Sequence, residues 1–203
     1  MRRNELESHD PAVFAEVARD AEFGELGLLT ADGTPRVVPL NFAAVGDAVY
    51  FHGALEGEKW DCLQADPRCS FSMVKAYSLI PSDWTTPRYA CPATHFYKSV
   101  ELRGRCELAD DLGEKARALQ AIMEKYQPEG GFDEIRTDNP IYAKALRDVA
   151  VFRVTGTWTA GAKFGQNEAE HHRRNWIAKL RERGEGRDLA TALEIEKALE
   201  DSS

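Results

Sequence analysis

A lysine in the first turn of an expected short helix is the feature of the sequence that points most directly to chemistry. A strand ending near His52 is followed by a turn that contains Gly53 and by a helix over 57–66, which places Lys59 in the first helical turn. Free backbone N–H groups and the positive end of a helix dipole favour an anion at such a position, where a lysine is otherwise disfavoured. The segment therefore predicts a phosphate site, with an ordinary surface lysine as the alternative.

A proline within an expected strand is a second feature that could serve a ligand. Pro39 stands in the segment Pro-Arg-Val-Val-Pro-Leu-Asn-Phe at 35–42. Proline has no N–H to give to a sheet, so the backbone groups around it are left for other partners. Such groups could bond a planar heterocycle lying along the strand. An edge strand that tolerates a proline explains the residues equally well.

A long strand over 94–108 carries a charge on its apolar face. Apolar and polar residues alternate through this segment, and Lys98 interrupts the apolar series. A charge in that place needs an anionic partner or a route to water. A second polar segment, Lys-Phe-Gly-Gln-Asn at 163–167, follows the last expected strand.

The elements that must position these residues are mostly strands. Period-two patterns and turn residues predict strands at 25–30, 36–44, 48–52, 68–75, 94–108 and 149–158. Helices are expected from Asp10, over 57–66, from Asp110 or Asp111 to about 126, over 140–147, from a capping box at Asn167 and Glu170 to about 183, and from Asp188. A long loop is expected over 76–92. About six strands with peripheral helices, and no glycine fingerprint or P-loop, favour a small antiparallel barrel.

Charge and composition argue against several classes of protein. The net charge is −8, from 34 acidic and 26 basic residues, which argues against binding of nucleic acid. No apolar run reaches the roughly 20 residues of a membrane helix, and the first residues do not resemble a signal peptide, so we expect a cytoplasmic protein. The four cysteines are expected to be free thiols. Cys91 and His95 lack further ligands nearby in sequence, so no metal site is predicted.

Four segments in order carry a resemblance to a known family. They read PRVVPLNF at 35–42, YFHGALEGEKWDCL at 50–63, DPRCSF at 66–71 and HFYKSVELRGR at 95–105. Together they resemble the pyridoxamine 5′-phosphate oxidase-like superfamily of FMN-binding split barrels, and within it the nitroimidazole-resistance-type flavoproteins. The tail KFGQNE at 163–168 is similar to the FMN-binding negative transcriptional regulators, although those usually have Arg where this chain has Glu168.

The resemblance implies a fold, a cofactor and a partner. The implied fold is mainly β with peripheral helices, a six-stranded antiparallel split β-barrel over 1–160, with a helical extension over 161–203. The implied assembly is a homodimer that holds two FMN molecules at the subunit interface. The residues in matched positions that would bind FMN are Val38, Pro39, Leu40, Asn41, His52, Gly53, Lys59, Trp60, Lys98, Ser99, Trp158, Gln166 and Asn167.

The resemblance also implies a reaction. FMN would take electrons from NAD(P)H and pass them to a small acceptor such as a nitro-aromatic or a quinone. His52 is the candidate for a group that donates a proton or orients the substrate, because imidazole titrates near neutrality. Two alternatives stay open. One is a flavin-binding regulatory protein without catalysis, and the other is a haem protein that would use His171 and His172.

Overall fold

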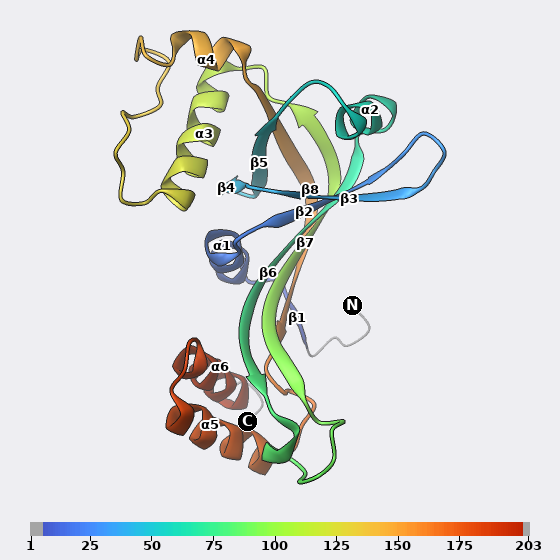
Figure 1. The fold of residues 1–203 in the computed structure, drawn as a ribbon, viewed down its shortest axis with the longest axis vertical. Helices are drawn as coiled ribbons and strands as arrows, with labels where there is room; N and C mark the ends of the chain where they lie inside the picture. The colour runs from blue at the N-terminus through green and yellow to red at the C-terminus, as the bar shows by residue number, and fades with distance from the viewer. Residues whose placement is uncertain (1–5, 201–203) are drawn as a thin grey trace. The chain divides into compact units, whose positions relative to one another are not determined.

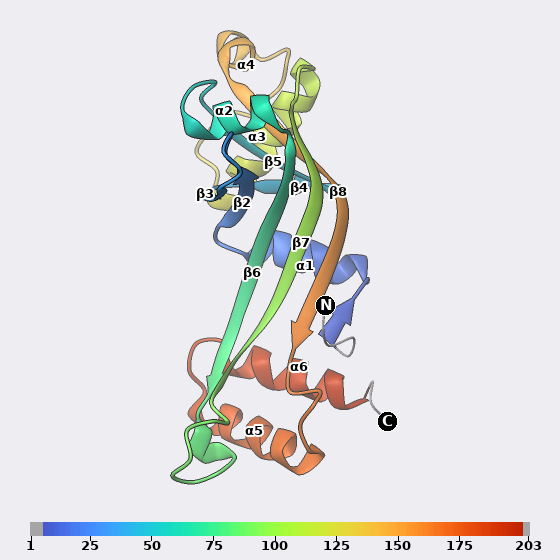
Figure 2. The ribbon, with the colours of Figure 1, turned by 90° about the vertical axis from the view of Figure 1, so that its right-hand side faces the viewer.

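The computed structural model describes residues 6–200 and divides them into two compact units. The barrel unit comprises residues 14–73 and 100–159, and the tail unit comprises the described residues of 1–13, 74–99 and 160–203. Three long strands contribute to both units. Figures 1 and 2 show the course of the chain through these elements.

One antiparallel sheet contains every strand of the described chain. The strand order is β3-β2-β6-β7-β8-β5-β4, and β1 pairs with β8 off this path. The strands are β1 (Glu7–Ser8), β2 (Gly24–Leu29), β3 (Pro35–Leu40), β4 (Ala43–Val45), β5 (Ala48–Gly53), β6 (Arg68–Ile80), β7 (Thr94–Leu108) and β8 (Ala150–Lys163).

The strand order requires the sheet to curl. Strands β3 and β4 lie at opposite ends of the path, yet only Asn41 and Phe42 connect them. Leu40 and Ala43 are three residues apart and can be separated by only about 10 Å, so the two ends of the sheet must come together. This geometry confirms the predicted antiparallel barrel with peripheral helices. The strand count is eight and not six, because the short strands β1 and β4 were not predicted as separate strands.

The helices follow the expected starts closely. They are α1 (Pro11–Asp20), α2 (Glu58–Ala65), α3 (Leu112–Tyr126), α4 (Ala143–Asp148), α5 (Glu170–Arg183) and α6 (Asp188–Glu200), and the 3₁₀ turn η2 spans Ser82–Trp84. Asp10 accepts a hydrogen bond from the N–H of Ala12, and Asp111 accepts one from the N–H of Glu114, so both act as caps. Within residues 6–200, no helix has the length and apolar character needed to cross a bilayer.

Two local predictions were wrong. The expected loop over 76–92 begins only after Ile80, because Tyr77 and Ile80 are buried in the core of the tail unit and extend β6. The expected capping box also fails. The N-cap of α5 is Ala169, which makes no side-chain cap, and the Asn167 amide donates to Glu168 instead.

Each unit has its own hydrophobic core. In the barrel unit the fully buried side chains include Leu26, Phe42, Phe51, Phe71 and Phe152. In the tail unit, α5 and α6 pack on residues of β6 and β7 through a cluster of Tyr77, Ile80, Phe96, Phe164, Trp176, Ile177, Leu180, Ala192 and Ile195. The C-terminal helices are therefore part of a packed core.

Candidate functional site

Helix α2 begins without a side-chain cap, directly after the turn that follows β5. Its N-cap is Gly57 at φ 82°, a left-handed value that glycine adopts at little cost. The first backbone hydrogen bond of this helix runs from the N–H of Asp61 to the carbonyl of Gly57. The N–H groups of the first turn therefore have no acceptor within the helix, which is the arrangement that binds anions.

Lys59 is a partly buried cation that lies over two aromatic rings. Its Nζ is 5.3 Å from the ring centre of Phe51 and 4.9 Å from that of Phe152. Burial lowers the pKa of Lys59 below its usual value, and the nearby Cys106 acts in the opposite direction. Within residues 6–200, the Lys59 amine makes no ion pair and no hydrogen bond. Because a desolvated cation without a partner is costly, an anion would stabilise this position.

Gly53 leaves the space that the Lys59 amine occupies. A Cβ atom built on Gly53 would lie 2.3 Å from Nζ of Lys59 and 3.8 Å from Cε2 of Phe152. Any side chain at position 53 would therefore displace the amine. The glycine at the end of β5 and the lysine of α2 therefore form one structural feature, and their predicted role at a phosphate stays a prediction.

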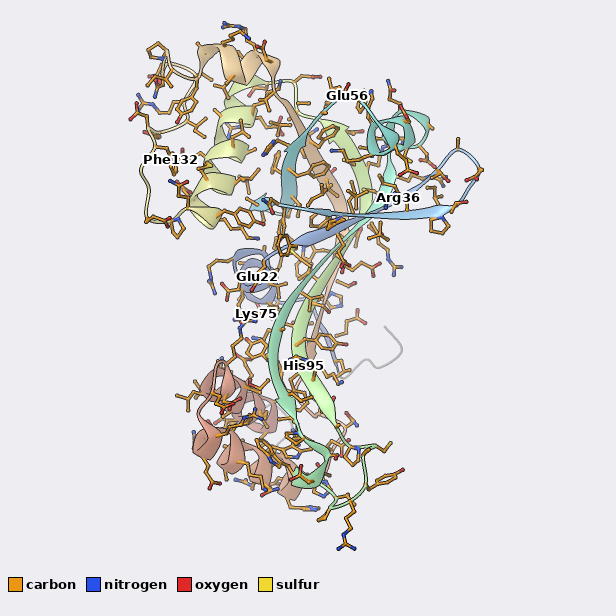
Figure 3. All side chains as sticks on the ribbon, in the orientation of Figure 1. Glu22, Arg36, Glu56, Lys75, His95 and Phe132 are labelled. Carbon is orange, nitrogen blue, oxygen red and sulfur yellow. The ribbon has the colours of Figure 1, made fainter. Side chains whose placement is uncertain are left out.

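Arg36 brings a second cation to the start of α2. Its Nε donates to Oε2 of Glu58 over 2.6 Å, and its Nη1 donates to the carbonyl oxygen of Val37 over 2.7 Å. Figure 3 labels Arg36 on β3. The contact joins β3 to the first turn of α2. Arg36 was not predicted as a site residue. The signal available in the sequence was a cation on the strand that contains Pro39.

Strand β3 forms one end of the sheet path. It pairs with β2 alone among the described strands, with Leu26 opposite Val38 and Gly24 opposite Leu40. Pro39 is exposed, as is Asn41 immediately after the strand. The edge-strand explanation of Pro39 therefore holds, and the same geometry leaves outward backbone groups for another ligand. The role of Val38 to Asn41 at a cofactor stays a prediction.

The other predicted residues of the barrel unit lie in different surroundings. His52 is exposed at the end of β5, opposite Val151 of β8. The Trp60 ring packs edge-on against Phe152, with 6.0 Å between ring centres. The Trp158 ring lies 5.3 Å from that of Phe14. His52 as a proton donor, and the two tryptophans as cofactor contacts, stay predictions.

Lys98 and Ser99 belong to the tail unit. Lys98 is 5% exposed and forms an ion pair with Glu194 over 2.8 Å. Its Nζ also lies 5.8 Å from the ring centre of Tyr77 and 5.9 Å from that of Phe164. The anionic partner that the strand pattern required is therefore Glu194 of α6. The roles of Lys98 and Ser99 at a cofactor stay predictions.

Gln166 and Asn167 follow β8 in the tail unit. Gln166 accepts from the N–H of Phe164 over 2.8 Å and donates to the carbonyl of Ala162 over 2.7 Å, so its amide braces its own turn. Asn167 lines a cavity of about 200 Å³. Other residues that line this cavity include Cys91, Thr94, Lys163, Glu168 and Trp176. As cofactor contacts, both residues stay predictions.

The remaining titratable side chains form no metal centre. Residues 6–200 contain no group of three or more His, Cys, Asp or Glu side chains arranged to hold a metal ion. Cys62, Cys69, Cys91 and Cys106 are free thiols, as expected. His171 is exposed, whereas the ring of His172 stacks on Trp176 and its Nδ1 is buried without a hydrogen bond to the described residues.

Comparison with known families decides the classification. The family model described as pyridoxamine 5′-phosphate oxidase matches residues 10–162, well over half of the 203 residues. The chain belongs to this family. The resemblance carried by the four sequence segments is thereby confirmed, and the curled antiparallel sheet is the family's split barrel.

Solved structures of the same fold include proteins that bind flavin or haem. A proposed 5-nitroimidazole antibiotic resistance protein from Bacteroides thetaiotaomicron is 24% identical at a TM-score of 0.60, and the match covers 76% of this chain and 85% of that one. A flavocytochrome from Azotobacter vinelandii is 24% identical at 0.65, covering 80% and 72%. An FAD and haem binding protein from Mycobacterium smegmatis is 19% identical at 0.64, covering 79% and 74%. No curated protein matches the sequence.

The barrel unit of this oxidase-family chain has the groups that a flavin nucleotide needs. Lys59 and the uncapped start of α2 are suited to a phosphate, and Gly53 keeps the space above Phe152 open for the amine. Arg36 lies at the same helix end and can donate to a phosphate once its contact with Glu58 is released. The edge of β3 that does not pair with β2 has backbone groups that could bond a flat ring system. The donor set therefore fits a flavin with a phosphate group.

Proposed function

We propose that this chain is a flavoprotein that binds FMN in the barrel unit. The observation that supports the proposal most is the Lys59 amine, which is partly buried and lies over two aromatic rings with no anion in contact among residues 6–200. A phosphate group would supply the missing charge. Membership of the pyridoxamine 5′-phosphate oxidase family, through the resemblance, implies FMN as the nucleotide.

Each group at the site has a defined task in this proposal. Lys59, Arg36 and the first-turn N–H groups of α2 hold the phosphate by charge-assisted hydrogen bonds. The edge of β3 from Val38 to Asn41 orients the ring. His52, exposed at the end of β5, donates a proton to the substrate from an imidazole nitrogen. When bound, FMN supplies the electron transfer itself.

The reaction that we propose is reduction of a small acceptor at the expense of NAD(P)H. Nitro-aromatics and quinones are the acceptors of choice, and the similarity to a proposed 5-nitroimidazole resistance protein supports the first of them. The four free cysteines are consistent with a reducing cytoplasm, where NAD(P)H is available. A protein that binds flavin for regulation without turnover would keep its flavin oxidised when NADH or NADPH is added.

The test begins with the absorbance spectrum of the purified protein and with mass analysis of the released cofactor, which separates FMN from FAD. Lys59→Ala should then weaken FMN binding by about 10- to 100-fold, because a hydrogen bond to a charged group contributes roughly 1.5–3 kcal/mol. Lys144→Ala is the matched control, since that lysine is 85% exposed in the same unit and pairs with Asp148. Equal FMN affinity in the two variants would remove the phosphate site.

We also propose that two copies of the chain form a homodimer. The barrel unit exposes several apolar side chains, among them Val37, Leu29 and Leu55, which are 53%, 42% and 50% exposed. Exposed apolar groups of this kind favour association. Light scattering during size-exclusion chromatography should give twice the mass of the 22.7 kDa chain.

Haem binding is a second candidate that one observation favours. The Nδ1 atom of His172 is buried and makes no hydrogen bond to the described residues, although Oε2 of Glu168 lies 4.0 Å from it, so this nitrogen could bind a metal. Two proteins of the same fold are a flavocytochrome and an FAD and haem binding protein. A Soret band in the wild-type protein that is lost in His172→Ala would support haem binding. A wild-type protein that shows no Soret band after haem is added would exclude haem binding.

A further inference from the structure

The last two residues of α3 fasten the open end of the β2–β3 hairpin. The Tyr126 hydroxyl accepts a hydrogen bond from the N–H of Phe42 over 3.1 Å and donates one to the carbonyl of Glu22 over 2.9 Å. Glu22 lies just before β2, and Phe42 lies just after β3. Figure 3 labels Glu22 at this end of the barrel unit. One hydroxyl therefore bridges the two chain segments that enter and leave the hairpin.

Lys125 also contacts Phe42, which lies just after β3. Its Nζ donates to the carbonyl of Ala18, in the last turn of α1, over 2.7 Å, and lies 3.4 Å from the ring centre of Phe42. The Phe42 ring is fully buried and packs edge-on against Phe71, with 5.2 Å between ring centres. Phe42 is thus fixed through its ring and through its backbone N–H.

Fixing the N–H of Phe42 also fixes the carbonyl of Asn41. The two groups belong to one peptide unit, which is planar, and the described chain contains no cis peptide bond. In a trans peptide the N–H and C=O point in opposite directions. Since the N–H points at Tyr126, the Asn41 carbonyl points away from α3. Asn41 is exposed and directly continues the exposed edge of β3.

We propose that Tyr126 and Lys125 are positioning residues for the flavin ring. They hold the peptide between Asn41 and Phe42 in one orientation, so that the Asn41 backbone presents a fixed dipole at the edge where the ring would lie. This inference rests on the proposed function. A fixed dipole beside a flavin changes both how tightly the ring binds and the electronic environment of its chromophore.

The test is Tyr126→Phe, which removes the hydroxyl and keeps the ring. Apo-protein is titrated with FMN, and affinity and the visible absorption band of bound FMN are measured. We expect about three- to tenfold weaker binding, as the loss of one or two hydrogen bonds predicts, together with a shifted band. Tyr142→Phe is the matched control, because the Tyr142 hydroxyl donates to the carbonyl of Asp133, also in the barrel unit. It should leave both measurements unchanged.

If Tyr126→Phe does not fold, two variants at Lys125 test the same inference. Lys125→Met removes the charge over Phe42 and should weaken FMN binding. Lys125→Arg keeps the charge and should bind FMN about as tightly as the wild type. A lower melting temperature in Tyr126→Phe or Lys125→Met, with wild-type affinity and an unshifted band, would overturn the inference and leave these residues a purely structural role. The proposed function fails separately, if wild-type protein binds no FMN or Lys59→Ala binds it normally.

Discussion

Two lysines of this chain lie over aromatic rings, and they differ in whether the protein supplies an anion. Lys98 in the tail unit is 5% exposed, and Glu194 contacts its amine at 2.8 Å. Lys59 in the barrel unit lies 4.9 Å from the Phe152 ring centre, and no carboxylate among residues 6–200 contacts it. Both amines are partly or fully desolvated. Only Lys98 has its charge neutralised within the fold.

The difference indicates that Lys98 has a structural role and that Lys59 is suited to bind an anion. Glu194 joins α6 to β7, so the Lys98 pair contributes to the packing of the tail unit. Within residues 6–200, Lys59 forms no ion pair with another element, and burial lowers its pKa. A cation that is held without a counter-ion at the start of an uncapped helix is suited to bind an anion from solution. The comparison thus predicts that changes at the two lysines affect different properties.

The largest effect should follow Lys98→Met. This change keeps the length of the side chain and leaves the Glu194 carboxylate, which is 14% exposed, without its buried partner. Removal of one partner of a buried pair is strongly destabilising, and Lys197 at 2.9 Å from Glu194 offsets part of the loss, so we expect about 3 kcal/mol. Chemical denaturation measures it.

The double variant Lys98→Met with Glu194→Gln is the control. It removes both charges and should recover much of the lost stability, because no unpaired buried charge remains. The sequence resemblance instead makes Lys98 an FMN ligand. Stable Lys98→Met protein that has lost FMN affinity would support that role and contradict the purely structural role of Lys98.

Gly53→Ala should have a smaller effect, confined to the cofactor. The new methyl group would lie 2.3 Å from Nζ of Lys59, which is the flexible end of a side chain and can move away at little cost in stability. The amine would then leave its place beside the helix start. We expect about tenfold weaker FMN binding, equivalent to about 1.4 kcal/mol, with an unchanged melting temperature.

Combining Gly53→Ala with Lys59→Ala tests whether the glycine acts through the lysine. If it does, the double variant should bind FMN no more weakly than Lys59→Ala alone. Additive losses would mean that Gly53 contributes separately, for example through its own backbone.

The sequence was sufficient for most of the fold because the decisive signals are local. Alternation over 94–108 located β7 to the residue, and Asp10, Asp111 and Gly184 marked helix ends. The extension of β6 to Ile80 was missed, because it depends on contacts with helices more than 80 residues away along the chain, such as the hydrogen bond from the N–H of Ser78 to Thr191. Long-range burial of this kind leaves no local pattern.

Only the part of the site that lies within one short segment of the sequence could be predicted. Gly53 and Lys59 lie six positions apart, and their proximity follows from the strand, the turn and the helix between them. Arg36 reaches the same helix end from β3, 22 residues earlier, which only the fold reveals. The partner of Lys98 was also revealed only by the fold, because a charge on an apolar face predicts an anionic partner but does not identify the residue.

Glu58→Gln should give the smallest effect, because it frees a cation at the proposed phosphate site and removes none. Glu58 holds Arg36 at 2.6 Å, with side chains 58% and 45% exposed, so the pair contributes less than about 1 kcal/mol to stability. The same carboxylate competes with a phosphate for Arg36. Its removal should raise FMN affinity about threefold and leave stability nearly unchanged, as titration and denaturation can measure. Glu56→Gln changes the net charge equally two residues away, so an equal gain in that control would show that overall charge, and not release of Arg36, is the cause.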